Sequence, residues 1–420
     1  MALFTRNFVL LWQGQLVSQL GNQAFLIATT FYVLQAGGSP GAVALVLMAS
    51  TIPLAVLGPI GGAAADRHSR RAILILTDLL RALTIAGLAA LIFWRPDATP
   101  RHVALIVGAA ALNGMMGALF APAYQALLPD LVPRDRLAAA NSVSQMSRQA
   151  STLIGQAAGG ILYVAWGPAG LLLFDALSFG YAGAATWLLP PEPGGRPTTS
   201  LRREVARYVA DTREGLSYVW GRAGMTAVLG IFAGVNCLFM PVFVLLPFYT
   251  QDVLGEGPVW YGFLLGGSGA GALAGSVAAG LALTPRRGTA TLVRGCLVGV
   301  ACAVLLLALS RSGWLALAAF TAIGVLSSLI NVAVITAFQS SVAPQMRGRV
   351  MALVIASSTA AVPLGMGLGG LLGDLWRESL PLIVAGCGLA IALLAALSLT
   401  VRGFSEALDA GASPGRCTER

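Results

Sequence analysis

The feature that most constrains this chain is a short charged segment between two long uncharged ones. Residues 7–65 contain no Asp, Glu, Lys, Arg or His. One acid and three arginines then follow within residues 66–71, and the apolar sequence resumes at residue 72. Because a helix needs about 20 apolar residues to cross a bilayer, this pattern predicts a hairpin of two membrane helices joined by a tight cationic turn.

The whole chain shares this shortage of charge. Its 420 residues are 57% hydrophobic and only 10% charged, with a mean hydropathy of +0.79. A soluble domain needs a charged shell, so the composition indicates a polytopic membrane protein whose surroundings are the lipid bilayer.

The apolar sequence divides into twelve windows long enough to cross a membrane. They span residues 8–34, 41–65, 72–94, 102–128, 138–164, 169–189, 223–250, 259–283, 290–309, 313–341, 349–373 and 380–401. We therefore expect an all-α fold with twelve transmembrane helices.

The basic residues indicate how these helices are oriented. All 26 are arginine, and when alternate loops are assigned to opposite sides, nineteen fall on one side, four on the other and three within spans. The positive-inside rule makes the arginine-rich side cytoplasmic and places both termini there. The net charge of +9 then reflects topology, so no nucleic-acid partner is expected.

A polar stretch at residues 190–222 separates six spans from six, and it begins with a Pro- and Gly-rich breaker. Its later apolar residues recur at helical spacing and predict an amphipathic helix at the cytoplasmic interface, although a solvated linker is the alternative; they are Val205, Tyr208, Val209, Leu216, Val219 and Trp220. We expect a six-helix bundle at 1–189, a linker at 190–222, a second six-helix bundle at 223–401 and a cytoplasmic tail at 402–420.

The two halves resemble each other in sequence. Ala123-Tyr124-Gln125 matches Ala337-Phe338-Gln339, and two further short motifs match at nearly the same offset. Such duplication is typical of transporters that bind substrate at the interface between repeats. It predicts two pseudo-symmetric bundles.

The charged segment and several other motifs are similar to those of the major facilitator superfamily. The loop signature G-x-L-x-D-R-x-G-R-R/K is matched by Gly62, Asp66, Arg67, Arg70 and Arg71, with Ala64 in place of Leu and Ser69 in place of Gly. Segments 131–141, 174–179, 213–218 and 345–350 resemble the drug:proton antiporter branch that contains macrolide-efflux and enterobactin-exporter proteins. The resemblance implies the major facilitator fold and a bacterial inner membrane.

The same resemblance implies a cytoplasmic gate formed by Gly62, Asp66, Arg67, Arg70, Arg71 and Asp130. In the family the acid lies near the N-terminus of the eleventh helix, where the helix dipole favours an anion. The arginines would bridge to nearby acids, here Asp130 or Asp135. The alternative is a topology signal without a gating role.

Charged residues inside the predicted spans are costly and usually functional. Asp78 and Arg81 lie three residues apart, so they share a helix face and can form a structural ion pair or a coupling site. Arg148 needs a cavity or a partner, such as Asp175 or Asp78. Asp175 has no cation beside it, and burial would favour its protonated form, as proton coupling requires. Alternatively, Asp175 only orients its helix.

Polar and aromatic residues recur at helical spacing on four spans. Polar side chains are costly against lipid, so these should face a cavity or another helix. Helices 1, 4, 7 and 10 are implied by the resemblance to line a central cavity, and packing residues are the alternative for each position. The cavity candidates are Gln15, Gln19, Asn22, Gln23, Asn113, Met116, Phe120, Tyr124, Asn236, Phe239, Phe243, Asn331, Phe338 and Gln339.

We therefore predict a monomeric secondary transporter that exports amphipathic or lipophilic small molecules by alternating access and proton antiport. A siderophore or other specific-metabolite exporter, or a facilitator without proton coupling, is the alternative. Asn22 stands where the resembling branch often has an acid.

Other classes of protein are not supported by the sequence. A G-x-S-x-G match at residues 37–41 has no strand before it, and a G-x-G-x-x-G match at 365–370 lies inside a predicted membrane helix, so we expect no enzyme. Both histidines lie at span edges and the five cysteines lie mostly in apolar runs. No metal and no cofactor are expected.

Overall fold

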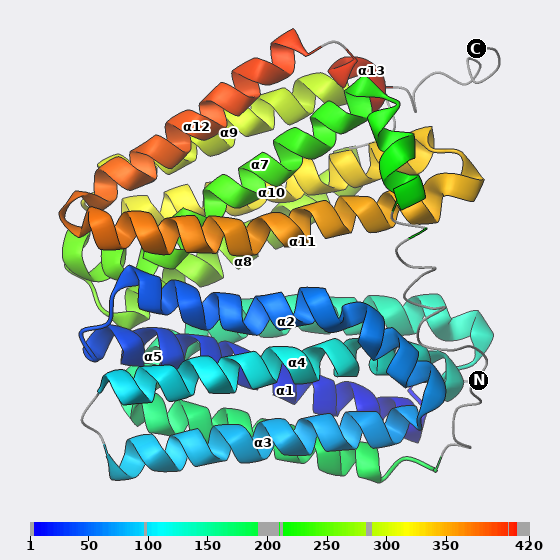
Figure 1. The fold of residues 1–420 in the computed structure, drawn as a ribbon, viewed down its shortest axis with the longest axis vertical. Helices are drawn as coiled ribbons and strands as arrows, with labels where there is room; N and C mark the ends of the chain where they lie inside the picture. The colour runs from blue at the N-terminus through cyan, green and yellow to red at the C-terminus, as the bar shows by residue number, and fades with distance from the viewer. Residues whose placement is uncertain are drawn as a thin grey trace. The chain divides into compact units, whose positions relative to one another are not determined.

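The structure is a computed structural model that describes residues 4–95, 99–191, 210, 213–282, 288–401 and 403–409. Over these residues the chain forms helices and turns and no strand, which confirms the predicted all-α fold. It divides into two compact units, both drawn in Figure 1. Unit 1 comprises residues 1–206 and 256–266, and unit 2 comprises residues 207–255 and 267–420. The division after residue 206 falls inside the predicted linker.

Unit 1 contains the helices of the first half of the chain. They are α1 (Arg6–Gln35), α2 (Pro40–Arg67), α3 (Arg70–Trp94), α4 (Pro100–Leu131), the short η1 (Arg134–Arg136) and α5 (Leu137–Trp187). α1 packs along α5, α2 packs along α4, and α3 contacts both α4 and α5. This packing brings the inner faces of α1, α3, α4 and α5 together.

Local sequence sets where the first three helices begin. Thr5, Ser39 and Ser69 are the N-caps, and each hydroxyl accepts the backbone N–H of the residue three positions later, at 3.3, 3.4 and 3.3 Å. Only two residues separate Arg67, which ends α2, from Arg70, which begins α3. The predicted tight cationic hairpin is therefore confirmed.

The long helix α5 is two helices joined at a kink. Gly167 has φ +66° and ψ −180° and is followed by Pro168. That backbone conformation is open almost only to glycine, and proline cannot continue the hydrogen-bond ladder. The fifth and sixth predicted spans therefore follow each other through a bend, without an intervening loop.

Ten helices in the described part of the chain are long and apolar enough to cross a membrane, and α5 is one of the ten. α1 is not among them because the amide side chains between Gln13 and Gln23 lower its mean hydropathy. If α1 is counted as a further span and α5 as two spans that meet at Gly167, we infer twelve spans.

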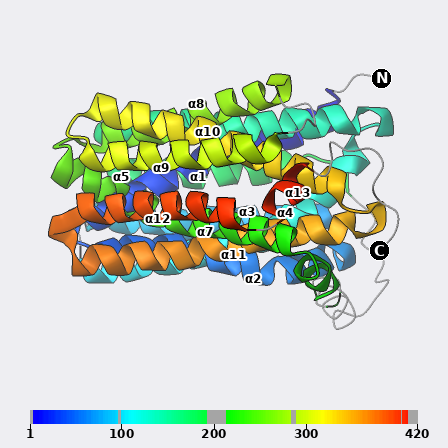
Figure 2. The ribbon, with the colours of Figure 1, turned by 90° about the horizontal axis from the view of Figure 1, so that it is seen from above.

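Unit 2 contains most of the remaining helices. They are α7 (Ala223–Phe248), the π-helical η2 (Tyr249–Val253), α8 (Pro258–Ala282, whose first turns belong to unit 1), α9 (Thr289–Leu309), α10 (Gly313–Ser341), α11 (Pro344–Leu375), η3 (Arg377–Ser379), α12 (Leu380–Thr400) and α13 (Phe404–Asp409). α7 packs along α11, while α9 lies beside α10 and α12, as Figure 2 shows.

The predicted linker and tail are only partly described. Val205, Tyr208 and Val209 lie outside the described residues, whereas residues 213–220 are helical, with Val219 buried and Trp220 exposed. The tail begins with the ordered helix α13. There the Asp409 carboxylate accepts backbone N–H groups at the start of α9, 3.2 Å from that of Ala290.

Many large apolar side chains are exposed along the spans. Leu83, Leu309 and Leu393 are 62%, 79% and 70% exposed. On a soluble protein such surfaces would drive association, but in a bilayer they face acyl chains of similar polarity. The exposure pattern is that of a multi-pass membrane protein.

Replacing Gly167 by alanine should destabilise unit 1, because a Cβ is strained at φ +66°. The expected cost is about 1–3 kcal/mol, measured as a lower melting temperature of the purified protein in detergent. Gly180→Ala is the matched control, since its Cβ would meet no atom within 4 Å and its φ is not positive. Equal melting temperatures for the two variants would contradict the strain argument.

Candidate functional site

Three charged residues are buried together inside unit 1. Asp78 and Arg81 lie on α3 and Asp175 lies on the second half of α5, and they are 1%, 8% and 0% exposed. Two acids and one base in an interior of this kind are rare, because each charge loses its hydration. This cluster is the candidate functional site.

The helix faces explain how the cluster forms. Asp78 and Arg81 share the face of α3 that also buries Leu74 and Ile85. Asp175 and Phe179 lie one turn apart on the inner face of α5. Since α3 packs on α5, these two faces bring the charges together although their sequence positions are far apart.

Arg81 lies at the centre of the cluster. Its guanidinium carbon is 5.4 Å from the centre of the Phe120 ring and 5.1 Å from that of Phe179, within cation–π range. One terminal nitrogen donates to the backbone carbonyl of Asn113, 3.3 Å away. The guanidinium also interacts electrostatically with both Asp78 and Asp175. One cation is thus shared between two acids and two aromatic rings.

Neither acid is tightly paired. Among the described residues, none of the four carboxylate oxygens of Asp78 and Asp175 has a hydrogen-bond partner, and no N–O contact within 4 Å links Arg81 to either acid. The Ser178 hydroxyl, close to Asp175, donates to the Asp175 backbone carbonyl at 2.7 Å. The direct Asp78–Arg81 ion pair allowed by the spacing is therefore not formed in this conformation.

The charge balance of the cluster favours a bound proton. With all three groups ionised the cluster would carry one uncompensated negative charge away from water, which costs several kcal/mol in low dielectric. Protonating one carboxyl group removes that excess and leaves one anion for Arg81. With one carboxyl group protonated, the cluster would carry no net charge.

α1 passes directly over Asp175. A Cβ on Gly21 would overlap both the Asp175 carboxylate and the Ser178 hydroxyl. Glycine is thus required for α1 to approach α5 this closely, and a small displacement of α1 would change the exposure of Asp175.

The cationic turn between α2 and α3 has partners within unit 1. Arg70 forms a 2.6 Å ion pair with Asp130 and donates to the Ala126 carbonyl at 2.9 Å. Arg71 donates to the Trp187 carbonyl at 2.5 Å and so caps the end of α5. These contacts tie the hairpin to the ends of α4 and α5.

The other predicted gate residues are placed as follows. Asp135 contacts its neighbour Arg136 at 3.4 Å instead of reaching the hairpin. Asp66 is exposed, and Gly62 is half-buried with open space where a Cβ would be. The contact expected between Asp66 and the start of α11 would join the two units and stays a prediction.

Arg148 does not pair with either buried acid in the described residues. It is exposed and donates to the side chain of Gln145. The suggested partnership with Asp175 or Asp78 is therefore wrong for this conformation, because Arg81 occupies that environment. Spacing along α3 indicates only Asp78 as a partner for Arg81, whereas the packing of α3 on α5 brings Asp175 close as well.

The predicted cavity residues of unit 1 have varied surroundings. Gln15 is buried, while Gln19, Asn22, Gln23 and Met116 are half-buried. The Asn22 amide donates to the Ser18 carbonyl at 3.0 Å, and Gln23 packs against Gly155. Phe120 and Tyr124 are buried and stacked 6.1 Å apart, and the Tyr124 hydroxyl lies 3.2 Å from that of Ser144. Of the predicted cavity residues, Asn113 and Phe120 contact the charged cluster, in both cases through Arg81.

The predicted cavity residues of unit 2 also differ in how far they are buried. Asn331 and Gln339 are exposed, whereas Phe338 is only 1% exposed and packs in the interior, so it lines no open space in this conformation. The Asn236 amide donates to its own helix at 2.8 Å. Phe239, which contacts the ring of Phe320, and Phe243 are half-buried.

Gly21, Ser178 and Phe179 lie at the cluster but were not among the predicted site residues. The four-residue spacing of Asp175 and Phe179 was a usable signal that they share a face. Nothing in the sequence indicated that α1 would cross at Gly21.

Comparison with known families identifies the chain. A family model described as transmembrane secretion effector matches residues 2–415. The chain belongs to this family of the major facilitator superfamily. The predicted resemblance to that superfamily is confirmed.

Individual relatives agree with this assignment. The chain is 30% identical to the multidrug efflux pump Tap of Mycolicibacterium fortuitum over 377 residues, covering 86% of this chain and 87% of that protein. It is 26% identical to macrolide efflux protein A of Streptococcus pyogenes over 370 residues, covering 88% and 89%.

Solved structures share the fold at low sequence identity. The nucleoside transporter NupG superposes with a TM-score of 0.76 at 10% identity, covering 94% of this chain and all of that one. A bacterial homologue of the human lysosomal transporter Spinster superposes with a TM-score of 0.70 at 12% identity, covering 97% and 98%. At these identities the likeness concerns the fold alone.

Removing the central cation should strongly destabilise unit 1. Arg81→Gln leaves two buried acids without a base, and breaking such a set costs about 3–5 kcal/mol, visible as a lower melting temperature. Adding Asp175→Asn to Arg81→Gln should restore part of the loss. Arg148→Gln makes the same change at an exposed arginine and should change little. Equal losses for Arg81→Gln and Arg148→Gln would contradict the role assigned to Arg81.

Proposed function

We propose that this protein is a proton-coupled exporter of amphipathic or lipophilic drug-like molecules that works by alternating access. It acts as a monomer in the bacterial inner membrane, with both termini in the cytoplasm. The names of its relatives, which describe macrolide and multidrug efflux, support the substrate class. The excess of arginine in alternate loops supports the orientation.

The single observation that carries proton coupling is the buried cluster of Asp78, Arg81 and Asp175. A proton on one carboxyl group leaves Arg81 free to pair with the other, and loss of that proton restores the competition between the two acids. Exchange of Arg81 between two partners on α3 and α5 is a two-state element that responds to protonation.

The same cluster offers a physical link to substrate. Phe120 and Asn113 are predicted substrate residues on α4, and both contact Arg81, through the ring and the backbone carbonyl. A bulky apolar molecule that displaced Phe120 would remove one of the groups that hold the guanidinium. Substrate and proton would thereby alter the same charge.

Coupling is tested by transport in proteoliposomes under an imposed pH gradient, with a macrolide and a fluorescent lipophilic dye as probes. The wild type should accumulate probe by up to about tenfold per pH unit if one proton exchanges for one substrate. Asp175→Asn or Asp78→Asn should equilibrate the probe without accumulating it. Asp135→Asn, the same change at an exposed acid, should behave like the wild type.

Two outcomes would reject this assignment. If both Asp175→Asn and Asp78→Asn still accumulate probe against its gradient, the coupling carboxylates lie elsewhere. If the wild type only equilibrates the probe under every gradient, the protein is a facilitator without proton coupling. If a siderophore probe is transported while the macrolide and the dye are not, the substrate is a siderophore instead of a drug-like molecule.

The gate is tested separately. Asp66→Ala should slow transport by about tenfold, equivalent to about 1.4 kcal/mol in barrier height, because a contact that closes the cytoplasmic side is lost. Substrate affinity, measured by equilibrium binding to the detergent-solubilised protein, should change little. Asp135→Ala is the control acid. If Asp66→Ala leaves the transport rate unchanged, the segment at 62–71 is a topology signal without a gating role.

A further inference from the structure

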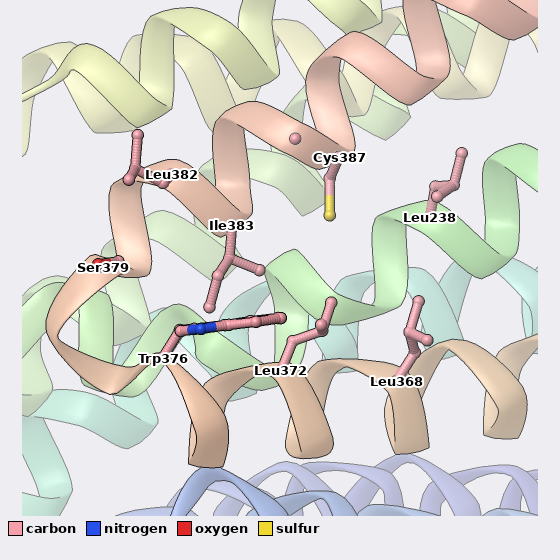
Figure 3. Close-up of a pocket in the computed structure, with 9 residues that line it drawn as sticks. Leu238, Leu368, Leu372, Trp376, Ser379, Leu382, Ile383 and Cys387 are labelled. Atoms are coloured by element: carbon pink, nitrogen blue, oxygen red, sulfur yellow. The ribbon is translucent and has the colours of Figure 1, made fainter.

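Unit 2 contains an apolar groove that the proposed transport cycle does not use. Its volume is about 460 Å³, and its walls come from α7, α11 and α12. In Figure 3, Leu368 and Leu372 rise from α11 towards Ile383 and Cys387 on α12, and Leu238 projects from α7. A volume of this size falls within the range of about 300–1,000 Å³ typical of small-molecule sites.

The groove runs along the membrane-spanning part of unit 2. From Ser379 at one end to Cys387 on α12, its wall extends eight residues, or about 12 Å at 1.5 Å per residue. One side is open, since Leu382 and Leu368 on its rim are 72% and 41% exposed. An opening with an apolar rim in a segment long and apolar enough to span a membrane suits the acyl chains of a bilayer better than water.

The end of the groove near η3 has the features of a membrane interface. Trp376 is 56% exposed there, as expected of an aromatic residue at headgroup level. Next to it, the Arg377 guanidinium lies 5.0 Å from the centre of the Phe248 ring, and its Nε contacts Asp252 at 3.4 Å. Its two terminal nitrogens have no hydrogen bond within the described residues. Such a planar pair of donors fits a phosphate.

We propose that this groove binds one acyl chain of a membrane phospholipid, with the lipid phosphate held at Arg377. Water is a poor occupant because the walls offer almost no polar partners, apart from Ser379 at the end. Under the proposed function a transport substrate is also a poor occupant. In the proposed orientation η3 follows the eleventh span and lies opposite the cytoplasmic side, where an exporter collects its cargo. The lipid would fill the space that α7, α11 and α12 leave between them.

Gly386 offers a way to fill the groove without disturbing the helices. It lines the groove, and nothing lies within 4 Å of the place where its Cβ would be. Gly386→Leu therefore adds a side chain to open space. Gly295→Leu is the matched control, because Gly295 is also an exposed helical glycine of unit 2 with open space around it and lies outside the groove.

The test uses phosphatidylethanolamine with a diazirine on one acyl chain, reconstituted with the full-length protein in vesicles and photolysed. Cross-links should map by mass spectrometry to the segments at 368–372 and 382–387. They should fall at least fivefold in Gly386→Leu and stay at wild-type level in Gly295→Leu. Size-exclusion profile and melting temperature confirm that each variant is folded.

The phosphate contact has its own control. Diacylglycerol with the same labelled chain lacks the phosphate, so it should cross-link less than the phospholipid in the wild type. Arg377→Gln should lower phospholipid cross-linking to the diacylglycerol level and leave diacylglycerol unchanged. Equal cross-linking of the two probes in the wild type would overturn the assignment of Arg377.

Two results would overturn the lipid assignment as a whole. One is the same cross-linking in Gly386→Leu and Gly295→Leu. The other is loss of cross-links on addition of a macrolide probe at concentrations that saturate transport, because the groove would then be a substrate site. Exclusion of a transport substrate from the groove rests on the proposed export direction, whereas neither result bears on whether Asp175 and Asp78 couple transport to protons.

Discussion

The imbalance between two buried acids and one buried arginine is the interaction on which the functional interpretation of this structure depends. Asp78, Arg81 and Asp175 lie where water cannot compensate their charges, and their sum is not zero. A proton is the smallest species that corrects the imbalance. Protonation of either acid would therefore change the net charge of the site, whatever the protein transports.

The rings and small residues around the cluster matter as much as its charges. The ring faces of Phe120 and Phe179 contact the guanidinium of Arg81. These contacts hold Arg81 in place without neutralising its charge. Gly21 lets α1 cover Asp175 closely. Four helices thus meet at one point, and a displacement of any of them changes the electrostatic environment of the acids.

Contacts at the charged hairpin between α2 and α3 are of a different kind. Arg70 and Asp130 are 32% and 55% exposed in their side chains, and exposed ion pairs contribute at most about 1 kcal/mol. Pairs this weak can form and break during a conformational cycle. The buried cluster suits the proton coupling proposed above, whereas the exposed hairpin ties the ends of α4 and α5 together.

The residue pattern alone predicts the fold class, the hairpin at residues 62–71 and which charged residues lie within the spans, because a bilayer restricts backbone structure and charge far more than water does. It also showed that Asp78 and Arg81 share a helix face. That Asp175 joins them and Arg148 does not follows from the way the helices pack. Helical spacing specifies neighbours along one helix, whereas partners across helices depend on which faces pack and how closely glycines such as Gly21 let them approach.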